Sequence, residues 1–157
     1  MINVAFTDIL LGGLAVALVV AAIVDIRTFT ISNWLNVGIA ALAPVYWLSV
    51  GLDPWPDMAI QLAVAAAVFA VFAITFVVGM MGGGDVKLAA ALALWFPPGA
   101  TLKFLVLMSI AGGVLTLLVV VVHRLRKREG KPEIPYGVAI AFGGLAILAQ
   151  RFLNQFA

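Results

Sequence analysis

The fold is decided by the stretch Gly82-Gly83-Gly84-Asp85-Val86-Lys87, which places a carboxylate between two long apolar segments. The chain has 157 residues, of which 65% are hydrophobic and only 10% are charged, and its mean hydropathy is +1.21. Soluble domains carry about 25% charged residues. The sequence therefore predicts a polytopic membrane protein, in which an ionisable residue such as Asp85 marks a functional site by default.

Apolar segments along the chain are predicted to form about six transmembrane helices. A helix needs ~20 apolar residues to cross a hydrocarbon core ~30 Å thick, and every segment except the fourth approaches that length. The segments lie at residues 9–25, 34–50, 59–80, 88–98, 103–123 and 135–153. We therefore expect an all-α integral membrane protein that forms a single domain over residues 1–157, with a short fourth span.

The distribution of Lys and Arg predicts the orientation in the membrane. The basic stretch from Arg124 to Lys131 would lie on one side of the spans, whereas loop 51–57 on the other side holds two acids and no base. Basic residues favour the cytoplasmic side. We therefore predict that both termini lie outside, and that Lys103 and Arg151 are the only basic residues on the outer side.

Asp25, at the end of the first apolar segment, is predicted to lie at the same membrane level as Asp85. Two spans separate these residues, and an even number of crossings returns the chain to the same face in either orientation. Two carboxyl groups a few ångströms apart cannot both ionise, so one keeps a proton while its partner can act as a base. Such a dyad can activate water and protonate an amide leaving group.

The glycines beside Asp85 suit a peptide substrate. Residues without a Cβ atom permit positive φ angles and let a second backbone approach closely, so we expect Gly82 and Gly84 to shape the site. A purely structural interpretation stays open, in which the glycines form a turn and Asp85 caps the following helix. Asp25 could likewise form an interfacial ion pair with Arg27.

Three motifs, in the same order, resemble those of the type IV prepilin peptidases. The stretch 82–87 looks like the GxGD motif of that family, and Ile134 to Ala139 resembles the opening of its last helix. The stretch Asp25 to Asn33 is similar to its first-aspartate segment, which usually continues through a basic patch to Ile-Pro-Asn. Ser32 replaces the usual proline, which we expect to loosen the start of the second helix. The resemblance is greatest to the small, single-function branch associated with Flp or tight-adherence pili.

The resemblance implies an intramembrane aspartic endopeptidase of the bacterial inner membrane, with its active site at the cytoplasmic face. Its substrates would be type IV or Flp prepilins or pseudopilins, from which it removes the leader peptide with the pair Asp25 and Asp85. In this scheme Lys87 holds the substrate carbonyl or tunes Asp85, and Tyr136 donates a hydrogen bond into the site. The alternative interpretations are a membrane anchor for Lys87 and an ordinary interfacial residue for Tyr136.

Other function classes are excluded or disfavoured by composition. The chain has no cysteine and a single histidine, His123, so we expect no metal site and no cofactor. The basic excess is confined to one loop, which argues against a nucleic-acid partner. Methyltransferase activity is not expected either, because the paired cysteines of the larger relatives are missing.

Two alternative functions stay open. A small proton-coupled transporter could use both aspartates as a relay, although such sites usually lie near the bilayer midplane. A catalytically inactive assembly factor of a pilus or secretion system could keep the same fold. The expected partners are a prepilin substrate, membrane lipids and the pilus assembly machinery.

Overall fold

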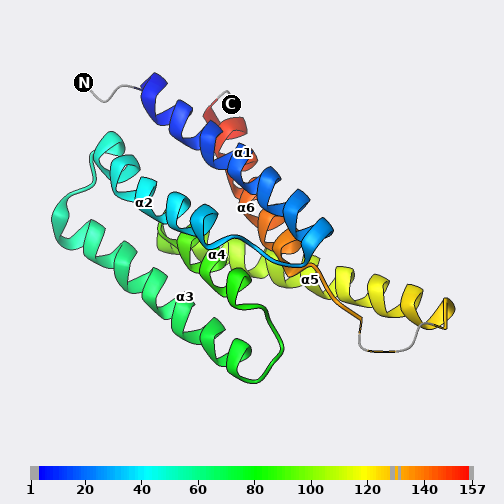
Figure 1. The fold of residues 1–157 in the computed structure, drawn as a ribbon. Helices are drawn as coiled ribbons and strands as arrows, with labels where there is room; N and C mark the ends of the chain where they lie inside the picture. The colour runs from blue at the N-terminus through cyan, green and yellow to red at the C-terminus, as the bar shows by residue number, and fades with distance from the viewer. Residues whose placement is uncertain (1–3, 128–129, 131, 156–157) are drawn as a thin grey trace.

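The computed structural model describes residues 4–127, 130 and 132–155, and within them all regular secondary structure is helical (Figure 1). A short kinked segment, η1 (Pro54–Met58), in which Trp55 has an extended conformation, precedes the third helix. The six α-helices are α1 (Val4–Thr28), α2 (Asn33–Val50), α3 (Ala59–Val77), α4 (Gly83–Ala93), α5 (Pro98–Leu125) and α6 (Tyr136–Gln155). The all-α prediction is confirmed for this part of the chain.

Four helical stretches are long and apolar enough to cross a membrane: Val4–Thr28, Pro54–Val77, Pro98–Leu125 and Tyr136–Asn154. They support the prediction of a multi-pass membrane protein. Helix α4 has 11 residues and therefore rises only about 16 Å, roughly half of a hydrocarbon core. The count of six spans and the outside position of the termini stay predictions.

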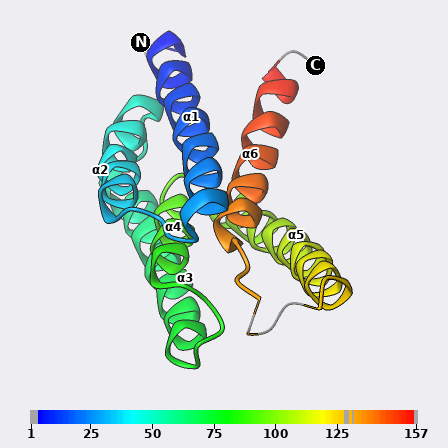
Figure 2. The same ribbon diagram turned by 45° about the vertical axis from the view of Figure 1, so that its right-hand side comes forward.

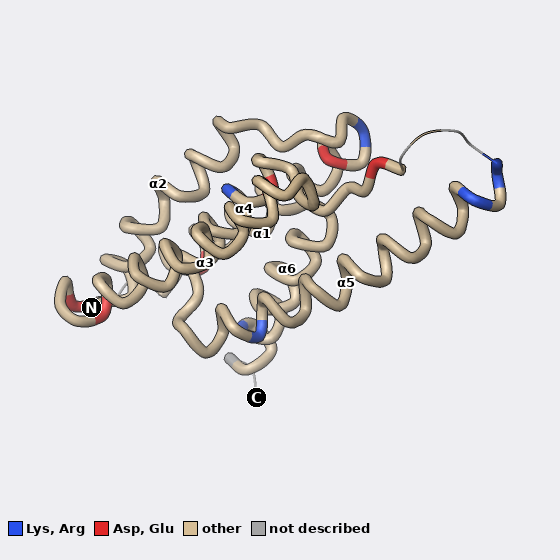
Figure 3. The backbone as a smooth tube through the Cα atoms, turned by 90° about the horizontal axis from the view of Figure 1, so that it is seen from below, with Lys and Arg blue, Asp and Glu red and all other residues tan. Residues whose placement is uncertain are grey.

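Both termini lie at one end of the bundle, and the connections α1–α2, α3–α4 and α5–α6 lie toward the other end (Figure 2). The last turns of α5 project away from the other helices in this view. Lys and Arg gather at this projecting end of α5, as Figure 3 shows. Of the predicted basic stretch, Arg128 and Lys131 lie outside the described residues.

The core surrounds α4 and the junction between α4 and α5. Seven of the 11 residues of α4 are buried, because α2, α3 and α6 all pack against this helix. Trp95, directly after α4, is only 1% exposed and donates from Nε1 to the carbonyl of Ile39 at 2.9 Å. Its ring stacks on Tyr46, with 5.1 Å between centroids. The short helix is thus an interior element, which carries Asp85 into the protein.

Helix α4 begins earlier than the sequence predicts. The predicted segment starts at residue 88, but the helix starts at Gly83, with Gly82 as its N-cap in an extended conformation. The amide of Val86 donates to the carbonyl of Gly82 at 3.2 Å, so the glycine run forms the first turn of the helix. The interpretation of this run as a simple turn between two spans is therefore wrong.

Ser32 gives α2 a defined start. Its side chain accepts a hydrogen bond from the amide of Trp34 at 3.3 Å, which makes it the N-cap of the helix. Serine is among the preferred N-cap residues because its hydroxyl satisfies a free backbone donor. The expected loosening of this helix start is therefore wrong, since a capping hydrogen bond replaces the constraint of proline.

Replacing the buried indole of Trp95 is expected to destabilise the fold. The Trp95→Phe variant loses the hydrogen bond to Ile39 and leaves a cavity, so its free energy of unfolding should fall by about 1–3 kcal/mol. Trp34→Phe is the matched control, because Trp34 is 84% exposed. Chemical unfolding in detergent micelles measures both effects. Equal stability of the two variants would contradict the packing described here.

Candidate active site

Asp25 lies in the last turn of α1 and is only 2% exposed. The first turn of α6 packs directly against its carboxyl group, and the backbone amides of Gly137 and Val138 donate toward it. A Cβ atom on Gly137 would lie 2.8 Å from Oδ2 of Asp25. Among the described residues no hydrogen bond reaches this buried Oδ2. The carboxyl group therefore keeps one oxygen available for a ligand or a proton.

Asp85 is the third residue of α4 and is 8% exposed. Its carboxylate accepts a hydrogen bond from the backbone amide of Gly82, the N-cap residue. This contact corresponds to the side chain of the third helical residue reaching back in a capping box. The alternative in which Asp85 itself is the N-cap is therefore wrong. A residue in the first turn of a helix holds its carboxyl group more rigidly than a residue in a loop between two helices would.

The fold brings the two carboxyl groups close enough for the charge of Asp25 to act on Asp85. Asp85 lies outside the four stretches that are long and apolar enough to cross a membrane. The pKa of Asp85 is raised to about 7, first because the carboxyl group is buried and second because the charge of Asp25 acts on it. Near neutral pH one member of the pair can therefore hold a proton while the other is ionised, as acid–base chemistry requires.

Ile31 sits between the starts of α4 and α6, beside the two carboxyl groups. A Cβ atom on Gly84 would lie 3.0 Å from the carbonyl oxygen of Ile31, and a Cβ atom on Gly137 would lie 2.6 Å from its Cδ1. Only glycine fits such close approaches without displacement of the neighbour. Gly84 and Gly137 therefore let the segment between α1 and α2 pack onto the site, where Ile31 is 7% exposed.

Two asparagines of α2 connect this helix to α4. Asn36 is buried and donates from Nδ2 to the carbonyl of Gly84 at 3.0 Å. Asn33 accepts a hydrogen bond from Nζ of Lys87 at 2.8 Å. Neither residue is among the site residues predicted from the sequence. Their spacing of three in an apolar helix was an available signal, because it places both side chains on one face and polar groups in such helices avoid lipid.

The other predicted site residues differ in how near they lie to the carboxyl groups. Gly82 contacts Asp85, since a Cβ atom there would lie 2.9 Å from Oδ2. Lys87 is exposed and directed to Asn33. Tyr136 begins α6, and its hydroxyl accepts from Thr116 of α5 at 3.4 Å. Tyr136 therefore joins α6 to α5, next to the turn of Gly137 that covers Asp25.

The sequence model of the type IV leader peptidase family matches residues 13–117, about two-thirds of the chain. The chain belongs to the type IV leader peptidase family. As a member of this family it is a peptidase, and the matched range contains both Asp25 and Asp85. The motif at residues 134–139 lies beyond the matched range. No protein of curated function and no solved structure matches the chain.

A methyl group added at Gly137 is expected to destabilise this leader peptidase. The Cβ atom of Gly137→Ala would collide with Ile31 and Asp25, and such overpacking should cost about 1–3 kcal/mol. Gly113→Ala is the control, because Gly113 lies inside α5 with no atom within 4 Å of an added Cβ. The control should be neutral or more stable by up to about 1 kcal/mol. Thermal unfolding of both variants measures the difference, and destabilisation by Gly113→Ala alone would contradict the geometry.

The raised pKa of Asp85 predicts how stability depends on pH. Because the folded pKa of about 7 exceeds the ordinary value of 3.8, this group stabilises the fold below pH ~4 and loses that contribution as the pH rises through 7. Asp85→Asn removes the loss, so the variant should match the wild type near pH 4 and exceed it at pH 8. The exposed Asp53 gives the control Asp53→Asn, which should keep the wild-type profile. A stability difference that does not change with pH would contradict the prediction.

Proposed function

We propose that this protein is an aspartic endopeptidase that removes the cytoplasmic leader from type IV or Flp prepilins or pseudopilins. The observation that supports the proposal best is the pair of buried carboxyl groups on α1 and α4 within a chain of the leader peptidase family. The two residues are far apart in sequence, and each is buried at the end of a helix. Functional sites are where such costly groups are retained.

The proposed reaction is hydrolysis by a water molecule held between Asp25 and Asp85. The ionised carboxylate accepts a proton from this water while the water oxygen attacks the scissile carbonyl carbon. The protonated carboxyl group then gives its proton to the amide nitrogen as the C–N bond breaks. The products are the leader with a new carboxylate and the mature chain with a new amine. The two aspartates titrate as one coupled unit, so neither role is fixed to one residue.

The burial of both carboxyl groups requires movement before an extended peptide can reach them. Ile31 covers the two carboxyl groups and packs closely against Gly84 and Gly137. These glycines have no side chains, and Ile31 fills the space that side chains would take. In our proposal the segment that carries Ile31 moves aside when substrate binds, and the peptide backbone then lies along the glycines. Such closing and opening of an active site is a common way to admit substrate and exclude water.

Lys87 lies at the polar end of a groove that suits the apolar part of a prepilin. The groove has a volume of about 360 Å³ and lies between α2, α3 and α4. Lys87 and the two asparagines Asn33 and Asn36 line its polar end, and the other lining side chains are apolar. In the proposed complex Lys87 holds a carbonyl oxygen of the substrate near the cut, and Tyr136 fixes the start of α6.

The proposed location is the inner membrane of a bacterium, with the site at the cytoplasmic face and pilus assembly proteins as further partners. The basic end of α5 lies at the same end of the bundle as the connections that flank the site, and basic residues favour the cytoplasm (Figure 3). Both carboxyl groups lie at helix ends, where a peptide at the membrane edge can reach them. That position favours a peptidase over a proton relay at the bilayer midplane.

Asparagine substitutions test the proposal directly. Asp25→Asn and Asp85→Asn keep the shape of each side chain but remove its ability to exchange a proton, so each should slow cleavage at least about 100-fold. The measurement is the leader-sized mobility shift of a co-expressed Flp-type prepilin. The control is Asp53→Asn, which changes an exposed carboxyl group and should cut at the wild-type rate.

The level of folded protein in the membrane must be compared for every variant. If a folded Asp25→Asn or Asp85→Asn variant still processes the prepilin at the wild-type rate, the dyad assignment is wrong. An inactive wild type, tested with several prepilins, would instead favour the assembly factor.

A further inference from the structure

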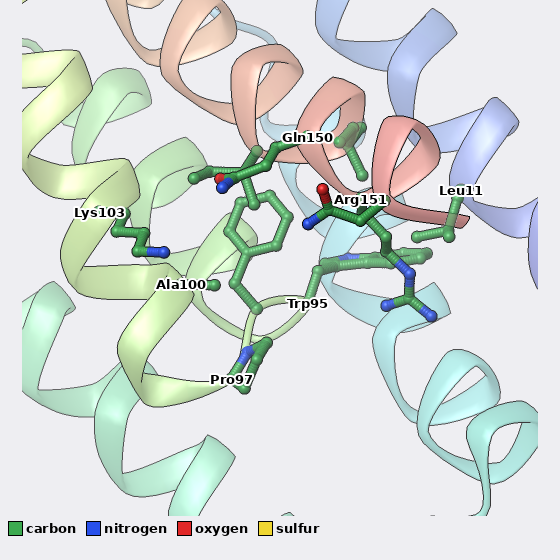
Figure 4. A pocket seen from close by; sticks show the side chains of 11 residues that line it. Leu11, Trp95, Pro97, Ala100, Lys103, Gln150 and Arg151 are labelled. Atoms are coloured by element: carbon green, nitrogen blue, oxygen red, sulfur yellow. The ribbon is translucent and has the colours of Figure 1, made fainter. Parts of the chain in front are cut away.

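A cavity of about 400 Å³ lies at the end of the bundle opposite to Asp25 and Asp85 (Figure 4). Its walls come from the last turns of α6, the start of α5 with the segment before it, and Leu11 of α1. Arg151 in this cavity and Gly137 beside Asp25 lie on the same helix, about 20 Å apart along its axis. The cavity is therefore separate from the candidate active site.

The polar lining of this cavity is cationic. Lys103 of α5 and Arg151 of α6 face it together with the amide side chains of Gln150 and Asn154, and no Asp or Glu is among the residues that line it. Figure 4 shows Lys103 on one side of the cavity and the guanidinium group of Arg151 on the other, beside Trp95. Two cations from different helices beside amide donors form a site for an anion with several oxygen atoms.

Arg151 is held in position by aromatic side chains. Its guanidinium group donates from Nη1 to the hydroxyl of Tyr46 and lies over the Tyr46 ring, 5.5 Å from the centroid. Tyr46 is buried and stacks on Trp95. The bond to Tyr46 uses one of the five donors of a guanidinium group, so the others can bind an anion. A preorganised cation binds an anion at a lower entropic cost than a mobile one.

The remaining walls of the cavity are apolar. Leu11, Phe96, Ile147 and Leu148 are the main contributors, and each is well buried in the core of the bundle. Because these side chains already pack within the protein, the cations are the part of the lining that a ligand would bind. A phosphate that carries acyl chains can bind the cations while its chains stay in the surrounding membrane, which supplies such molecules.

We propose that this cavity binds the headgroup of an anionic phospholipid, with its phosphate between Lys103 and Arg151. Gln150 and Asn154 donate to the glycerol or ester oxygens, and the acyl chains stay in the bilayer. Basic pockets between transmembrane helices bind anionic headgroups on the cytoplasmic side, and we extend this mode of binding to the predicted outer side. The lipid would connect α5 to α6 and, through Tyr46, to α2, so it would stabilise the bundle without taking part in peptide cleavage.

The main rival is an ion pair within the protein. Arg151 also lines a neighbouring cavity of about 360 Å³ that contains Asp57, so a side-chain rotation could direct the guanidinium to this carboxylate. In that case the cation would serve the fold and need no ligand. The two explanations differ in whether the effect of Arg151 depends on added lipid.

The test uses the full chain in nanodiscs of phosphatidylcholine with or without phosphatidylglycerol. We expect phosphatidylglycerol to raise the thermal midpoint of the wild type and to remain bound in native mass spectrometry when phosphatidylcholine has dissociated. The Lys103→Gln/Arg151→Gln variant should bind phosphatidylglycerol at least about tenfold more weakly and lose the thermal shift. The charge-preserving variant Lys103→Arg should keep both properties.

Two control variants and one added anion decide the outcome. Arg124→Gln/Arg126→Gln removes two charges at the other end of α5, and this variant should keep the bound lipid. If it loses as much phosphatidylglycerol as the cavity variant does, the lipid is held by general electrostatic attraction and the proposal is overturned. Asp57→Asn should also leave lipid binding unchanged. The proposal is overturned as well if the cavity variant loses stability equally without phosphatidylglycerol, or if millimolar inorganic phosphate reproduces the thermal shift. Cleavage of a prepilin is a separate readout, so failure here leaves the proposed peptidase function unaffected.

Discussion

Burial of two carboxyl groups within reach of each other's charge is the constraint on which the rest of this structure depends. A buried charge is costly unless it is paired or receives hydrogen bonds, and a second like charge nearby raises the cost. The structure meets this cost with backbone donors, from Gly82 to Asp85 and from Gly137 and Val138 to Asp25. A single proton held by the pair would remove the remaining repulsion. In the proposed function, the same arrangement supplies the acid and the base for peptide hydrolysis.

The requirement for backbone donors determines how the helices meet. A carboxyl group can contact an amide of another helix only where no side chain intervenes, which explains glycine at position 137. The same space admits Ile31, which packs between α4 and α6 and closes the site. Asn36 then holds α2 to the first turn of α4 through the carbonyl of Gly84. Four helices thus converge on one end of the bundle.

The sequence predicted the pairing of Asp25 with Asp85 because counting the crossings between them needs no atomic detail. It placed the start of α4 too late, since a run of glycines has low helix propensity and only the N-cap conformation of Gly82 shows that the helix begins there. Ser32 caps α2 through its own hydroxyl, a property that comparison with the usual proline does not reveal. The spacing of Asn33 and Asn36 in an apolar helix was a signal for a polar helix face. Gly137 acts through contacts across the fold, which no local pattern contains. The cavity at Lys103 and Arg151 arises in the same way.

The most direct test of the central claim, that Asp25 and Asp85 interact as one unit, is a double-mutant cycle on unfolding free energy. Asp25→Asn, Asp85→Asn and the double variant would be compared with the wild type at pH 8 and at pH 4. If the two carboxyl groups repel each other, the single effects will not add at pH 8, with a coupling energy of about 0.5–3 kcal/mol, and this coupling will disappear at pH 4. Additive effects at both pH values would show that the groups do not interact and would contradict the account.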